Sequence, residues 1–264
     1  MILHALSTGK RLAALGRVVL FCVGCAVILM AASRYTPKLP GQWTMVVLEG
    51  GAGVATLGLS FLFAGRARIG VEPDRGSLAR LVFGAVLGLL MVGMQTLLLG
   101  SLGHIRWERQ AGVGFGTLGV AALGFLMVGL REEIAFRGYP LRRLENAFGG
   151  WVALAIMAVF FAIEHVAGGM GWKQALWGPL VGGIVFGLAA LGTRGLALPI
   201  GMHAAWDFAQ WILGFRDGSG IWQVVVDAGF ERRVEQVATG SYLVVMGSAI
   251  LGFLLYGQTR EGES

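Results

Sequence analysis

Long apolar runs separated by short polar segments dominate this sequence. A helix needs about 20 mostly apolar residues to cross the hydrocarbon core of a bilayer, and most of the runs approach that length. Because backbone groups in lipid must satisfy one another, such runs are expected to form helices. The fold class that follows is all-α, a polytopic transmembrane helix bundle of about eight spans. The expected spans are residues 12–32, 44–65, 80–101, 113–136, 151–168, 174–192, 197–214 and 240–257.

The composition supports an integral membrane protein and gives no reason to expect a nucleic-acid partner. Apolar residues make up 56% of the chain and charged residues only 14%, against about 25% charged in an ordinary soluble domain. The net charge of +6 comes from short basic clusters between apolar runs, which membrane topology explains. With the N-terminus inside, thirteen of the 21 Lys and Arg residues fall in inner segments and eight in outer ones. We therefore expect a plasma-membrane protein with both termini in the cytoplasm.

The first apolar run allows two alternatives. Its end, residues 30–33, contains small residues that suit cleavage of a signal peptide, but the many later spans favour a first transmembrane helix. The same run contains Cys22 and Cys25 as a C-x-x-C pair. Without a soluble redox context or further ligands, we interpret them as small core thiols.

The charged sequence Arg131-Glu132-Glu133 ends the fourth apolar run. Ionisable residues at membrane depth are costly and indicate function by default. Residues four apart share a helix face, so Glu133 should form a buried ion pair with Arg137. Glu132 points about 100° away and is expected to be the free carboxylate, suited to act as a general base. The alternative is that both acids end the helix at the cytoplasmic headgroups beside Arg131.

Two histidines lie in later spans. His165 follows Glu164 in the fifth span, although the two side chains point roughly 100° apart. His203 and Asp207 are four residues apart in the seventh span and should stack on one face. Such a pair can share a metal, or the carboxylate can orient the imidazole. The alternative for each histidine is a structural contact between helices.

Residue counting relates the first two of these positions. The glycines at 149–150 indicate a turn between the fourth and fifth spans; Glu132 lies 17 residues before it and His165 lies 15 after it. An antiparallel hairpin would place them at similar depth. At 1.5 Å per residue, His203 is only about 10 Å into its span and His165 about 20 Å into its own. The depths would agree if part of 137–150 lay along or outside the membrane surface.

Three motifs occur in order across consecutive spans: E-E-x-x-x-R at 132–137, F-x-x-x-H at 161–165 and H-x-x-x-D at 203–207. In this order they resemble the CPBP family of intramembrane proteases, which includes CAAX prenyl proteases and bacteriocin-processing-like Abi proteins. The resemblance covers roughly residues 115–215. It divides the chain into variable N-terminal spans, a catalytic core and a short polar tail, at residues 1–110, 111–257 and 258–264.

The resemblance implies a polar cavity within the membrane where water is activated against a peptide carbonyl. It implies that the substrate is a membrane protein or a lipidated peptide. Whether a metal such as zinc is bound is left open; two histidines and a carboxylate suit it, and its possible ligands are Glu132, His165, His203 and Asp207. Many members have Asn in the last motif position, whereas Asp207 donates a hydrogen bond only when protonated. The implied catalytic residues are Glu132, Glu133, His165, His203 and Asp207, with Arg137 and Phe161 in structural roles.

Two other classes of function stay open. A non-catalytic immunity or scaffold protein of the membrane could use the same residues for packing. A proton or ion transporter could use them as a relay, to which Glu49 in the second span adds a further acid. Substitution of Glu132, His165 and His203 without a phenotype would favour the first class, and a pH-dependent flux into vesicles would favour the second.

Overall fold

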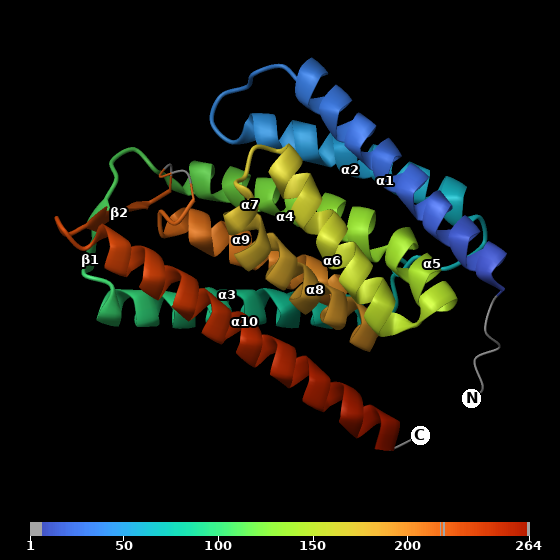
Figure 1. Cartoon of the computed structure of the whole chain (residues 1–264). Coiled ribbons are helices and arrows are strands. Elements are labelled where there is room, and N and C mark those ends of the chain that lie inside the picture. Colours follow the sequence, from blue (N-terminus) through green and yellow to red (C-terminus); the bar gives the residue numbers. More distant parts are fainter. Residues whose placement is uncertain (1–6, 217, 219, 263–264) are drawn as a thin grey trace.

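The computed structural model describes residues 7–216, 218 and 220–262, which form a helical bundle with one small sheet (Figure 1). The sheet pairs β1 and β2 in antiparallel register. The helices are α1 (Thr8–Tyr35), α2 (Trp43–Ala64), α3 (Ser77–Leu102), α4 (Phe115–Arg137), α5 (Tyr139–Phe148), α6 (Gly150–Ala167), α7 (Trp172–Trp177), α8 (Pro179–Thr193), α9 (Ala197–Ile212) and α10 (Glu231–Gly262), and the strands are β1 (Ile105–Arg109) and β2 (Trp222–Val226).

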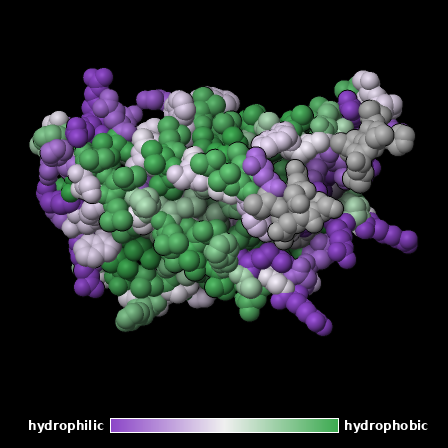
Figure 2. Space-filling model, turned by 90° about the horizontal axis from the view of Figure 1, so that it is seen from below, coloured by the Kyte–Doolittle hydropathy of each residue, from purple (hydrophilic) through white to green (hydrophobic). Residues whose placement is uncertain are grey.

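Every expected span lies over helical residues, which confirms the helical class, although the span expected at 174–192 is divided between α7 and α8. Within the described residues, six segments are long and apolar enough to cross a membrane: α1, α2, α3, α6, α7 with α8, and α10. The expected number of eight is thus confirmed for six; α4 and α9 are not among them, and α9 has only 16 residues. Figure 2 shows apolar side chains over the middle of one face and hydrophilic ones toward its two ends. These features are those of an integral membrane protein.

Helices α4 and α9 lie inside the bundle, where α2 packs on α4, α3 packs on α9, and α4 and α9 pack on each other. Glycines allow the close approach of α3 and α9. A Cβ at Gly84 would lie 2.2 Å from the Leu198 carbonyl oxygen, and one at Gly201 would lie 2.0 Å from that of Leu81. Small residues bring helix backbones together in this way in membrane proteins. The contact fixes α9, and with it His203, against the bundle.

The segment between α4 and α6 differs from the expected simple hairpin. Helix α4 ends at Arg137, and α5 begins at Tyr139 with Pro140 in its first turn, where proline's missing N–H costs no hydrogen bond. The turn at residue 149 is confirmed, with Gly149 in the left-handed region at φ 86°. Because α5 is a separate helix, counting back from that turn does not give the depth of Glu132. For His165 and His203 to lie at similar depth, residues 137–150 had to leave the fourth span, and α5 is such a separate segment.

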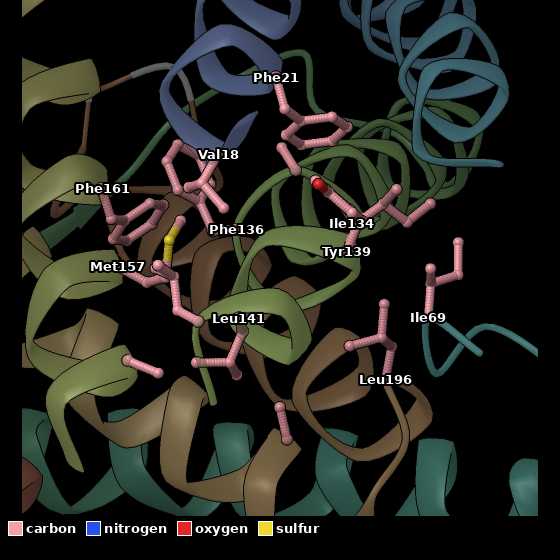
Figure 3. Close-up of a cluster of buried hydrophobic side chains, with 14 of the residues drawn as sticks. Val18, Phe21, Ile69, Ile134, Phe136, Tyr139, Leu141, Met157, Phe161 and Leu196 are labelled. Carbon is pink, nitrogen blue, oxygen red and sulfur yellow. The ribbon is translucent and has the colours of Figure 1, made fainter. Parts of the chain in front are cut away.

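The largest apolar cluster packs α1 against α4, α5 and α6 (Figure 3). Its aromatic side chains include Phe21, Tyr139 and Phe161; the rings of Phe21 and Tyr139 have centroids 5.2 Å apart. Cys22 and Cys25 are unoxidised and pack on this cluster, as expected for small core thiols. The cluster extends to Phe161 and therefore supports one wall of the candidate site.

The two strands were not among the expected elements. They join the connection after α3 to the connection after α9, with Trp107 Nε1 donating a hydrogen bond to the Leu213 carbonyl at 3.2 Å. The sheet lies at one end of the bundle, while the start of α1 and the end of α10 lie toward the other (Figure 1). Helix α10 continues to Gly262, so the expected polar tail begins within a helix. Residues 263–264 of that tail lie outside the described residues.

Candidate functional site

The charged end of α4 is buried in the protein. Arg131, Glu132, Glu133 and Arg137 have relative exposures of 6%, 6%, 0% and 1%. They do not end the helix at the headgroups, so that alternative is wrong. The expected ion pair is present, with Arg137 Nη1 3.2 Å from Glu133 Oε1. The end of α4 is therefore an internal polar site enclosed by other helices.

Arg137 and Phe161 connect the polar groups to the surrounding helices. The Nη2 of Arg137 donates a hydrogen bond to the Gly183 carbonyl at 3.3 Å. Its guanidinium carbon lies 4.3 Å from the centroid of the Phe161 ring, a distance suited to a cation–π contact. The same ring meets both histidines of the site, with centroid distances of 4.6 Å to His165 and 6.1 Å to His203. Phe161 is thus the common apolar neighbour of the two imidazoles.

Glu132 is not the free carboxylate that the sequence suggested. Its Oε1 accepts a hydrogen bond from Arg131 Nη2 at 2.8 Å. Its Oε2 is buried without a hydrogen-bond partner among the described residues and lies 3.5 Å from His203 Nε2. The expectation holds for one oxygen only: Oε2 is available as a base, while Oε1 is anchored.

His203 is oriented by Glu133 rather than by Asp207. Its Nδ1 lies 2.8 Å from Glu133 Oε1, and its ring stacks on Phe186 with centroids 4.4 Å apart. Asp207 shares the face of α9 as expected, with Oδ2 3.9 Å from His203 Nε2. That same oxygen pairs with Arg216 at 2.6 Å. The nitrogen directed at Glu132 and Asp207 is therefore Nε2.

His165 reaches the site from α6. Its Nδ1 lies 2.9 Å from the Phe161 carbonyl oxygen; because a carbonyl oxygen can only accept, Nδ1 donates this hydrogen bond and Nε2 is left to meet the pocket. His165 and Glu132 both line a pocket of about 410 Å³. The other lining residues are Leu29, Arg131, Glu164, Gly168, Met170 and Gln174. Glu132 thus joins this pocket to His203, and residues of α4, α6 and α9 come together.

Four ionisable residues have larger parts here than the sequence indicated: Arg131, Glu49, Glu164 and Arg216. Arg131 bonds to Glu49 on α2 and to Glu164 on α6, in addition to Glu132. Glu164 therefore faces Arg131 and the pocket, one position before His165. An acid inside an apolar span indicates a buried partner. Glu49 lies in the second apolar run, so its position in the sequence could have indicated a buried cation such as Arg131. No pattern in the sequence pointed to Arg216 as the partner of Asp207.

The candidate metal ligands do not surround a common point. Within the described part of the chain, no group of three or more His, Cys, Asp and Glu residues is arranged to hold a metal ion. Guanidinium groups already occupy one oxygen each of Glu132 and Asp207, and structural or catalytic zinc requires at least three protein ligands around one position. This arrangement does not fit zinc, and the steps proposed below use only the chain's own residues.

Comparison with known proteins agrees with the three motifs. A search of curated proteins finds no match. Residues 114–209 match the family described as type II CAAX prenyl endopeptidase Rce1-like, a range that runs from the start of α4 to three residues before the end of α9. This range contains all the residues of the site described above except Leu29, Glu49 and Arg216. Residues 114–209 therefore form an Rce1-like domain of the type II CAAX prenyl endopeptidase family, within the CPBP group, in a chain whose described residues include six candidate membrane spans.

Proposed function

We propose that the chain is an intramembrane endopeptidase that hydrolyses a peptide bond in a membrane-associated substrate, with Glu132 as the general base. One observation supports this assignment most directly. Glu132 Oε2 is buried, accepts no hydrogen bond from a described residue, and faces His203 Nε2 at 3.5 Å beside a pocket. A buried carboxylate oxygen that accepts no hydrogen bond from the described residues is suited to take a proton from a bound water.

In the first step, a water in the pocket lies between Glu132 and His165. Glu132 Oε2 takes its proton, while His165 Nε2, whose partner nitrogen is held by the Phe161 carbonyl, accepts the second O–H and orients the nucleophile. The hydroxide oxygen bonds to the substrate carbonyl carbon, and the carbonyl oxygen acquires the negative charge. The proton held by Glu132 then passes to the leaving amine as the peptide bond breaks.

His203 stabilises the oxyanion. Glu133 accepts the Nδ1 hydrogen at 2.8 Å, so a protonated ring can donate from Nε2 to an oxyanion that forms beside Glu132. A donor fixed in advance where charge develops is the largest single contribution in many enzymes. Asp207, 3.9 Å from Nε2, keeps a negative charge beside the imidazolium, and Arg216 holds Asp207 in place.

The family name defines the substrate class to test first, a prenylated protein that ends in a CAAX sequence. The proposed active site is the pocket between α1, α4 and α6, and its polar lining within an apolar bundle suits a substrate that arrives from the membrane. With both termini in the cytoplasm, the basic connections at 66–80 and 142–143 would face the cytoplasmic leaflet.

The test uses an internally quenched farnesylated peptide ending in a CAAX sequence, called the probe peptide below, with purified protein in detergent micelles. Glu132→Gln should lower kcat by about 100-fold to 10,000-fold, the usual contribution of a general base. Glu145→Gln is the matched control, because Glu145 is a carboxylate that pairs with Arg142 and Arg194 outside the site. Full activity in Glu132→Gln would refute the assignment. Comparison of membrane peptidomes from cells that express each protein identifies the natural substrate.

A transporter is the second candidate, because the ionisable groups form a continuous line. Hydrogen bonds and ion pairs link Glu49, Arg131 and Glu132, and His203 and Asp207 continue the line to Arg216. Protein reconstituted in vesicles distinguishes the two functions. A pH-dependent flux together with an uncleaved probe peptide would favour the transporter.

A further inference from the structure

Arg131 has more buried acceptors than an ordinary ion pair provides. Its Nε donates to Glu49 Oε2 at 2.5 Å, its Nη1 to Glu164 Oε1 at 2.8 Å and its Nη2 to Glu132 Oε1 at 2.8 Å. The Arg131 side chain is 8% exposed. The acceptors lie on α2, α6 and α4. Because a guanidinium is a rigid plane, bonds at all three nitrogens fix both its position and its rotation.

The same bonds determine how Glu132 lies. Consecutive residues point about 100° apart on a helix, so Arg131 and Glu132 do not share a face. The guanidinium reaches Glu132 while Glu49 and Glu164 hold its other two nitrogens. Glu132 is then held at Oε1, which leaves Oε2 directed toward His203 Nε2 at 3.5 Å. The direction of the proposed catalytic oxygen is therefore set from outside the three sequence motifs.

A purely structural role explains this cluster poorly. One guanidinium faces three carboxyl groups in the interior, and the Oε2 atoms of Glu132 and Glu164 are buried without hydrogen-bond partners in the described part of the chain. Buried charges contribute little net stability even when well paired, and apolar residues often do better. An arrangement that costs stability beside a pocket indicates a functional constraint.

We infer that Arg131 is a positioning residue: anchored by Glu49 and Glu164, it holds Glu132 by one oxygen so that the other faces the reacting water. This inference rests on the proposed function. Lysine cannot replace Arg131, because an ammonium is a point charge without the rigid fork that spans three acceptors. Misplacement of a catalytic group by 1 Å can lower the rate by about 100-fold.

The experiment measures kcat and KM for the probe peptide. Arg131→Lys keeps the charge and should lower kcat by about 10-fold to 100-fold, with KM within about twofold because the other residues that line the pocket are unchanged. Arg142→Lys is the matched control. Arg142 also donates to a carboxylate and a backbone carbonyl, those of Glu145 and Ala190, but outside the site, so its kcat and KM should equal those of the wild type.

Glu49→Gln decides the question if Arg131→Lys does not fold. Glu49 contacts Arg131 from α2, so loss of its charge should lower kcat by about 3-fold to 30-fold through the displaced guanidinium, again without a change in KM. Wild-type kcat in a folded Arg131→Lys or Glu49→Gln protein would overturn the inference, as would an equal loss in Arg142→Lys. If the wild type leaves the probe peptide uncleaved, or Glu132→Gln cleaves it normally, the proposed function itself fails.

Discussion

The contact between α3 and α9 gives a sharp prediction for Gly201→Ala. The added Cβ would lie 2.0 Å from the Leu81 carbonyl oxygen, 2.9 Å from the Leu81 carbonyl carbon and 3.0 Å from Ala85 N. Ordinary contact begins at 3.4 Å, so the two helices must separate locally by about 1.4 Å, the difference between 3.4 Å and 2.0 Å. All three atoms belong to the backbone, and no side-chain rotation can relieve the overlap.

The expected magnitude follows from two opposing effects. Alanine favours a helix over glycine by about 1 kcal/mol, while overpacking a close interface costs about 1–3 kcal/mol. The overlap with backbone places the cost at the upper end, so we expect a net destabilisation of about 1–2 kcal/mol. His203 follows two residues later on α9, and its displacement should lower kcat for the probe peptide by about 10-fold to 100-fold.

The matched control is Gly93→Ala on α3, where a Cβ would meet nothing within 4 Å. It should unfold at the same denaturant concentration as the wild type or slightly higher, because only the helix preference acts there. Unfolding in mixed micelles, followed by circular dichroism, measures stability, and the probe peptide measures kcat. Equal stability and equal kcat in the two alanine variants would refute the argument that a close glycine contact positions His203.

Two further substitutions test the surroundings of the site and the start of α3. Phe161→Leu removes the ring shared by both imidazoles and the guanidinium of Arg137. It should lower the free energy of unfolding by about 1–3 kcal/mol in the same assay. The control Phe115→Leu, at a 94% exposed position, should leave that free energy unchanged. Hydrogen bonds from Arg80 and from the Gly76 N–H hold the pKa of Asp74 below its ordinary value, so their stabilising effect is complete above about pH 4 and is lost as the pH falls through the lowered pKa. Thermal unfolding should therefore separate wild type from Asp74→Asn at pH 6, and the difference should shrink on acidification; a constant difference down to pH 2 would contradict this assignment.

The helices and part of the site could be predicted from the sequence because the relevant physics is local. Apolar runs of membrane length gave the helix positions, and the fixed geometry of a helix gave the Glu133–Arg137 ion pair. The His203–Asp207 stacking follows from the same spacing, although the two groups are 3.9 Å apart rather than in tight contact. The ordered motifs gave the family.

The partners across helices could not be predicted in this way. Nothing local specifies that Arg131 turns from the expected cytoplasmic end to meet Glu49 and Glu164, since that depends on how α2 and α6 pack on α4. The break at Gly138 could not be predicted either. The short helix α5 follows it, so the number of residues between Glu132 and the turn at Gly149 does not give the depth of Glu132. Tertiary packing also determined that Glu133, and not Asp207, orients His203.

The interior position of α4 and α9 has a consequence for biogenesis. Helix α4 ends in four buried charged residues, and helix α9 has only 16 residues. Each helix is therefore a poor candidate to enter lipid alone. Each has its principal partner earlier in the chain, α2 for α4 and α3 for α9. During synthesis, the partner helix is therefore already available when α4 or α9 emerges. If the two helices enter the membrane together, the partner can shield polar groups whose exposure to lipid would be costly.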